Sequence, residues 1–175
     1  YVIRKCAERA VRESAIEGRD YFYIPSLSSS TIVFKGLLLP HQIPQYYQDL
    51  TDSSLTSALA LVHSRFSTNT FPTWPLAHPY RYICHNGEIN TLKGNVNWMR
   101  ARQGRLNSEL FGEDMKKLFP IVYENQSDSA SLDNALEFLV LGGRSLPHAM
   151  MMLIPEPWVA NPQMDLDRRG FYEYH

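Results

Sequence analysis

Three short segments contain polar residues of the types that bind an amino acid and stabilise charge at an amide carbonyl. The first is Arg65, which follows an apolar stretch in the run 63–70, HSRFSTNT. Its guanidinium is a planar fork of donors that can hold a carboxylate through two charge-assisted hydrogen bonds, as an enzyme would hold the α-carboxylate of an amino acid. The alternative is a structural ion pair or a surface arginine, since most arginines are exposed.

The second segment is the Asn86-Gly87 dipeptide in the run 84–90, CHNGEIN. An asparagine side-chain N–H and a glycine backbone N–H that converge on one point form an oxyanion hole, which stabilises the charge that develops when a nucleophile attacks an amide carbonyl. The alternative is a simple hairpin turn, for which this dipeptide is a strong signal.

The third segment places Asp128 directly before a strongly helical stretch. Its carboxylate could accept hydrogen bonds from a substrate ammonium group and so form the opposite half of an amino-acid clamp with Arg65. Asp128 could equally be the N-cap of the helix, because aspartate is among the preferred capping residues.

Cysteines and histidines suggest other chemistry, which their spacing does not support. Adjacent strand residues point to opposite faces, so Cys84 and His85 would be poorly placed to exchange a proton, and we expect Cys84 to pack in the core. Spacings of 15 and 7 between His63, His78 and His85 match no zinc-ligand motif. We therefore expect structural histidines and no metal site.

Composition narrows the class of protein. The 175 residues carry a net charge of −1, and 44% are hydrophobic, as in an ordinary globular protein. Nucleic-acid binding usually requires a basic surplus on one face, and a membrane span requires about 20 apolar residues, so we expect neither partner. Only two cysteines are present, which argues against a disulfide scaffold and favours a cytoplasmic protein.

The elements that must position these residues are predicted from periodicity. Strands are expected at 1–5, 21–25, 31–39, 58–63 and 80–84. The 58–63 run is almost entirely apolar, which favours a strand covered on both faces. Helices are expected at 6–16, 42–50 and 145–154, from residue 90 onward, and from Leu132 to the Gly142-Gly143 pair. Strands predominate in the first half without regular βαβ alternation, so we predict an α+β fold.

Taken together, the motifs resemble the glutaminase domain of glutamate synthase large subunits, a class II glutamine amidotransferase domain. The resemblance rests on 63–70 (HSRFSTNT), 74–79 (WPLAHP), 85–91 (HNGEINT), 94–95 (GN), 127–129 (SDS), 132–134 (LDN) and 155–165. It implies an N-terminal-nucleophile hydrolase fold, a four-layer αββα sandwich with antiparallel sheets, incomplete at its N-terminus.

The resemblance also implies roles for the site residues. Arg65 would bind the α-carboxylate of glutamine, and Asp128 its α-amino group. Asn86 and Gly87 would bind the oxyanion. Ammonia released from the side-chain amide would then serve the reductive amination of 2-oxoglutarate to glutamate.

In that family the nucleophile is a cysteine at the mature N-terminus, with its own α-amino group as the base. Here residue 1 is a tyrosine, and neither Cys6 nor Cys84 stands in the nucleophile's context. The sequence also begins without a Met and ends without a terminating signal. We therefore expect an internal segment of a longer chain that hydrolyses no glutamine by itself.

We expect residues 1–154 to form a partial type 2 amidotransferase domain and residues 155–175 an extended arm. The implied partners are glutamine and the synthase domain of the same polypeptide, and a small reductase subunit is left open. FMN and an iron–sulfur cluster are implied for the full-length enzyme, although no motif here binds either cofactor. The alternative function is a non-catalytic amino-acid-binding module that has lost its nucleophile through evolution.

Overall fold

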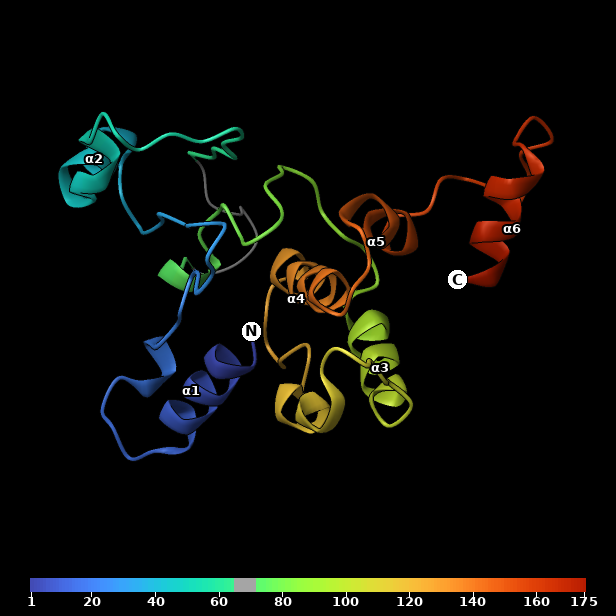
Figure 1. Cartoon of the computed structure of the whole chain (residues 1–175), viewed down its shortest axis with the longest axis horizontal. Helices are drawn as coiled ribbons and strands as arrows, with labels where there is room; N and C mark the ends of the chain where they lie inside the picture. The colour runs from blue at the N-terminus through green and yellow to red at the C-terminus, as the bar shows by residue number, and fades with distance from the viewer. Residues whose placement is uncertain (65–71) are drawn as a thin grey trace.

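The computed structural model describes residues 1–64 and 72–175, and the regular structure within these ranges is helical (Figure 1). The α-helices are α1 (Val2–Glu13), α2 (Ile43–Tyr46), α3 (Leu92–Gln103), α4 (Asp128–Leu141), α5 (Leu146–Leu153) and α6 (Leu166–Tyr174). The 3-10 helices are η1 (Arg19–Tyr21), η2 (Pro40–Gln42), η3 (Gln48–Thr51), η4 (Trp74–Leu76) and η5 (Gly112–Leu118).

The predicted strands are not formed. Within 1–64 and 72–175 no residue lies in a β-strand, so the strands predicted at 1–5, 21–25, 31–39, 58–63 and 80–84 are wrong and the two-sheet αββα arrangement is not confirmed. A strand needs hydrogen bonds from a neighbouring strand, which an apolar run cannot supply by itself. Leu59 and Val62 are 75% and 82% exposed, so the 58–63 run is not covered on both faces.

The first helix begins earlier than the sequence predicted. α1 confirms most of the helix predicted at 6–16 and extends it back to Val2, through the stretch predicted as a strand. Its polar residues Arg4, Lys5 and Glu8 are buried, whereas Ile3 is 76% exposed. The β-branched residues at the start favour a strand locally, but the contacts of the buried polar face outweigh that small preference.

The helices predicted around the candidate site are confirmed as α3, α4 and α5. The Ser127 hydroxyl caps α4 by accepting the Ala130 N–H. The chain leaves α4 through Gly142 and then Gly143, whose φ of +102° is a left-handed conformation that glycine tolerates. α5 begins after a second serine cap, Ser145, and ends before Pro155.

The stretch predicted as an extended arm, 155–175, contains a helix that the sequence analysis missed. The Asp165 carboxylate caps α6 by accepting the Arg168 N–H. α6 is short and contains Gly170, so apolar periodicity gave no signal there. None of the helices in the described residues is both long and apolar enough to cross a membrane.

Helix α4 lies at the centre, with α3 and α5 beside it (Figure 1). Leu136 and Phe138 are two positions apart and so face roughly opposite sides of the helix. They belong to two apolar clusters. The first cluster comprises Tyr80, Ile83, Ala130, Leu136 and Ala149, and the second comprises Met115, Leu118, Ile121, Val122 and Phe138.

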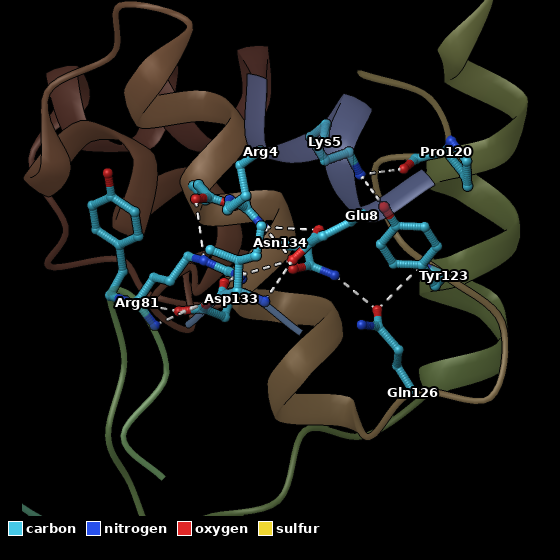
Figure 2. A network of polar contacts seen from close by, with 12 residues as sticks. Arg4, Lys5, Glu8, Arg81, Pro120, Tyr123, Gln126, Asp133 and Asn134 are labelled. Carbon is cyan, nitrogen blue, oxygen red and sulfur yellow. Dashed lines mark hydrogen bonds and ion pairs between the residues drawn. The ribbon is translucent and has the colours of Figure 1, made fainter. Parts of the chain in front are cut away.

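A further side of α4 is polar and joins a buried ring of charges, the ionic ring, made of Arg4, Glu8, Arg81 and Glu137. Figure 2 labels Arg4, Glu8 and Arg81 of this ring. Arg4 lies 3.2 Å from Glu8 and 2.5 Å from Glu137. Arg81 lies 3.6 Å from Glu8 and 3.5 Å from Glu137. Each arginine therefore contacts both glutamates, and the ring ties α1 and the segment around residue 81 to α4.

Lys35 is a buried cation outside this ring. It is 2% exposed, its Nζ donates to the Pro75 carbonyl at 2.9 Å, and it lies over the rings of Tyr23 and Tyr80. Burial, together with the charge of Arg81, lowers the pKa of Lys35 to about 7. The ammonium group thus loses its proton in the folded chain at a pH where an unfolded lysine keeps it.

We expect the free energy of unfolding to rise with pH between about 7 and 9. In this window the unfolded chain binds the Lys35 proton, since its pKa is then near 10.5, and the folded chain does not. Each such lysine adds a slope of about 1 kcal/mol per pH unit. In urea unfolding at pH 7, 8 and 9, Lys35→Met should lower the slope of the free energy of unfolding with pH by this amount. Lys93→Met, at an exposed lysine, should leave the slope unchanged. Equal slopes in all three proteins would contradict the assignment.

Candidate functional site

The structure places three of the four predicted site residues near one another. Asn86 and Gly87 lie in the loop that precedes α3, and Asp128 is the first residue of α4. The fourth, Arg65, lies outside the described residues. The contacts that bring the loop to α4 come from two carboxylates of that helix.

Asp128 holds the backbone that follows the Asn86-Gly87 loop. Its Oδ2 accepts the Ile89 N–H at 2.6 Å, and its Oδ1 accepts the Ser129 N–H at 2.7 Å. The Ser127 hydroxyl, not Asp128, caps the helix, so the alternative role of Asp128 as the N-cap is wrong. The half-buried carboxylate therefore stands at the positive end of α4 with its oxygens beside the Asn86-Gly87 loop.

Asp133 holds the start of the segment 81–89, before the Asn86-Gly87 loop. The sequence did not predict this role. Its Oδ1 accepts the Tyr82 N–H at 2.8 Å, and its Oδ2 accepts the Arg81 N–H at 3.2 Å. Asp133 is 1% exposed, and this burial raises the pKa of its carboxyl to about 6 although both N–H groups oppose the rise. Helix α4 thus binds the segment 81–89 at both ends. The signals in the sequence were a carboxylate within the apolar period of the helix and its place in the 132–134 (LDN) motif.

Both residues that are predicted to supply oxyanion donors are hydrogen-bonded to imidazoles. The Asn86 Oδ1 atom lies 2.8 Å from His63 Nε2, and the Gly87 N–H donates to His85 Nδ1 at 3.0 Å. The first bond uses the oxygen of the Asn86 carboxamide and leaves its nitrogen on the other side of the group. The second bond uses the Gly87 N–H itself, so this N–H must leave His85 or be shared before it can bind an oxyanion.

The three histidines gather into one group, the histidine cluster of His63, His78 and His85. The His63 and His78 rings stack with centroids 4.6 Å apart, and the His78 and His85 rings meet edge to face at 5.4 Å. Burial, followed by the neighbouring imidazoles, lowers the pKa of His78 to about 4, so that ring is neutral at neutral pH. Among the described residues, no three His, Cys, Asp or Glu side chains are arranged to hold a metal ion.

Cys84 is half-buried, so the prediction that it packs in the core is met only in part. Its thiol donates weakly to the Val62 carbonyl at 3.4 Å, and burial raises the pKa of the thiol above its usual value. The thiolate is the nucleophilic form of cysteine, so this shift makes Cys84 a poorer nucleophile at neutral pH.

Known sequences match this chain over the whole range that contains these residues. The profile of the glutamine amidotransferases of class II matches residues 1–175. The chain is 60% identical over its full length to the glutamate synthase [NADPH] large chain of Bacillus subtilis (strain 168). It is 53% identical over 156 residues, 89% of the chain, to the glutamate synthase [NADH] of Saccharomyces cerevisiae. It is 45% identical over 180 aligned residues, 100% of the chain, to the ferredoxin-dependent glutamate synthase of Pyropia yezoensis.

The chain spans 11%, 7% and 12% of the lengths of these three relatives. The resemblance inferred from the ordered motifs is thus confirmed across the whole chain. The activities in the relatives' names belong to proteins many times longer.

Proposed function

The chain belongs to the class II glutamine amidotransferases, and from this we propose that it forms the glutamine-binding and oxyanion-stabilising part of the glutaminase domain of a glutamate synthase. The observation that carries the proposal is the contact between Asp128 and the Ile89 N–H at 2.6 Å. It brings a carboxylate suited to a substrate ammonium group to the loop that carries Asn86 and Gly87.

In the proposed reaction, Asp128 accepts hydrogen bonds from the α-amino group of glutamine, and Arg65 binds the α-carboxylate. The side-chain amide is attacked by a thiolate, and the carbonyl oxygen gains negative charge as the tetrahedral intermediate forms. The Asn86 side-chain N–H and the Gly87 N–H stabilise that charge most strongly in the transition state. The amide nitrogen takes up a proton as the C–N bond breaks and leaves as ammonia. Water then hydrolyses the remaining thioester, which releases glutamate and the thiol.

We assign the attacking thiolate to a residue outside these 175. The raised pKa of Cys84 and its position beside the Val62 carbonyl do not favour an amide-attacking nucleophile. Cys6 lies on α1, which packs against η5. On this proposal the 175 residues alone release no ammonia from glutamine.

The ammonia is proposed to serve a synthase part that forms glutamate from 2-oxoglutarate, in the same cytoplasmic polypeptide. Iron–sulfur clusters are held by four cysteine thiolates, or by two cysteines and two histidines. This chain has two cysteines, and among the described residues no three His, Cys, Asp or Glu side chains are arranged to hold a metal. The donor set does not fit, so we assign the cluster, together with FMN, to the remaining length of the protein. A small reductase subunit is a further partner in this proposal.

The function is tested on the full-length product of the gene. We expect ammonia release from glutamine, and glutamate formation from 2-oxoglutarate with either glutamine or added ammonia. Glutamine binding without ammonia release would instead support the alternative, a non-catalytic amino-acid-binding module.

Asp128→Ala should raise KM for glutamine and also lower kcat. A lost charge-assisted hydrogen bond to the ammonium group costs about 1.5–3 kcal/mol, which is roughly a 10- to 100-fold rise in KM. The fall in kcat follows because Asp128 also holds the Ile89 N–H. Asp128→Asn keeps an oxygen acceptor for that N–H but loses the charge, so its kcat should lie closer to the parent's while KM stays high.

Steady-state kinetics with glutamine, and separately with added ammonia, measure both effects. Activity with ammonia should be unchanged in both variants, because that chemistry is assigned to another part of the protein. An Asp128→Asn protein with the parent's KM for glutamine would remove the ammonium-binding role.

A further inference from the structure

We infer that His63 is a positioning residue of the oxyanion site, which fixes the Asn86 carboxamide so that its nitrogen, and not its oxygen, faces a substrate carbonyl. The inference rests on the proposed function, and it adds a residue whose only expected role from the sequence was structural. It starts from the 2.8 Å contact between His63 Nε2 and Asn86 Oδ1.

The chemistry of the two groups sets the direction of this bond. A carboxamide oxygen can only accept, so the imidazole must donate, and His63 carries a proton on Nε2. With the His63 proton on Nε2, this bond is lost if the carboxamide rotates by half a turn, because its NH₂ group would then face an N–H donor. His63 therefore favours the one orientation in which the Asn86 nitrogen is on the side away from the imidazole.

This orientation matters only when charge develops on a substrate. The Asn86 residue is exposed, so the core formed by the described residues does not hold its carboxamide in place. In the rotated orientation its oxygen would face the negative carbonyl oxygen and repel it. A donor that is oriented in advance stabilises the transition state without reorganisation, which is the main source of oxyanion stabilisation.

Packed rings hold His63 itself. It stacks on His78 at 4.6 Å, and His78 meets the buried ring of Tyr80 edge to face at 4.7 Å. The Tyr80 hydroxyl lies 3.0 Å from the hydroxyl of Ser127, the cap of α4. A continuous series of contacts thus runs from the start of α4 to Asn86. Gly87 is held by a different imidazole, His85, so His63 acts on only one of the two donors.

The test compares two variants of similar size in the full-length product of the gene. His63→Met has no donor, whereas His63→Gln can present an amide N–H to Asn86 Oδ1. We expect His63→Met to lower the glutamine-dependent kcat by roughly tenfold, less than the loss of the Asn86 donor itself, with KM changed less than about threefold. His63→Gln should recover most of this loss. The exposed His41→Ala serves as the control and should match the parent.

A double-mutant cycle separates positioning from a general structural role. In an Asn86→Ala background there is no carboxamide to orient, so His63→Met should cost no further activity. Equal kcat losses in both backgrounds, or equal kcat for His63→Met and His63→Gln, would overturn the inference. Urea unfolding of each variant reports whether it folds, because activity with added ammonia is assigned to another part of the protein.

The two levels of proposal fail in different ways. If the parent protein releases no ammonia from glutamine, the proposed function fails and the inference fails with it. If the parent hydrolyses glutamine and His63→Met does so at the parent's rate, only the role of His63 is lost.

Discussion

Asn86→Ala should lower the glutamine-dependent kcat of the full-length protein by roughly 10²–10³-fold, about 2.7–4 kcal/mol of transition-state stabilisation. The Asn86 nitrogen matters most once the carbonyl oxygen carries charge, so KM for glutamine should change little. The loop itself should stay in place, because Asp128 and Asp133 hold its backbone on either side. The effect is therefore expected on the chemical step and not on binding.

Steady-state kinetics with glutamine and with added ammonia check this prediction. Asn97→Ala, an exposed asparagine of α3, is the matched control and should behave as the parent does. Activity with ammonia should survive in both variants. An Asn86→Ala protein with normal glutamine kcat would remove the oxyanion assignment, and the positioning role of His63 with it.

Glu137→Gln should destabilise the chain by about 3–5 kcal/mol. Glu137 pairs with both Arg4 and Arg81 in the ionic ring, and all of these side chains are at most 7% exposed. Without this carboxylate, two buried guanidinium groups share the single charge of Glu8, and an uncompensated buried charge is costly. The loss is a large fraction of the 5–15 kcal/mol that stabilises a typical domain.

Urea unfolding followed by circular dichroism measures the difference. Glu124→Gln is the control, since the Arg100–Glu124 pair is exposed and such pairs contribute about 0–1 kcal/mol. If the two variants unfold at the same urea concentration, the ionic ring does not hold α1 to α4. Because Arg81 also belongs to the ring, the same variant should loosen the segment that leads into the Asn86-Gly87 loop.

The helices could be predicted from the sequence because their signals are local. The apolar period from Leu132 and the glycine pair at 142–143 predicted α4, and Pro155 predicted the end of α5. Hydrogen bonds of a helix join residues four apart, so a short window of sequence contains all the partners. The strand predictions failed for the opposite reason. The hydrogen-bond partners of a strand lie elsewhere in the chain, and the apolar run at 58–63 does not indicate which segment they belong to.

The roles of the candidate site residues stay predictions. Residue types and motif order pointed to Asn86, Gly87 and Asp128, and also to Arg65, which lies outside the described residues. They did not show that Asp128 holds the Ile89 N–H or that Asp133 holds the backbone at Arg81 and Tyr82. Such contacts join residues 39 to 52 positions apart and depend on how α4 packs.

The sequence by itself determined the family, the central helices and the residue types that could bind an amino acid, because these depend on local order and on side-chain chemistry. Only the tertiary structure decided which polar groups meet. It placed Arg4 of α1 against Glu137 and Glu8 of α1 against Arg81, and it stacked His63 on His78 beside Asn86. The physical reason is that a buried charge or an oriented carboxamide is stable only with its partner in contact, and packing of distant segments supplies that partner.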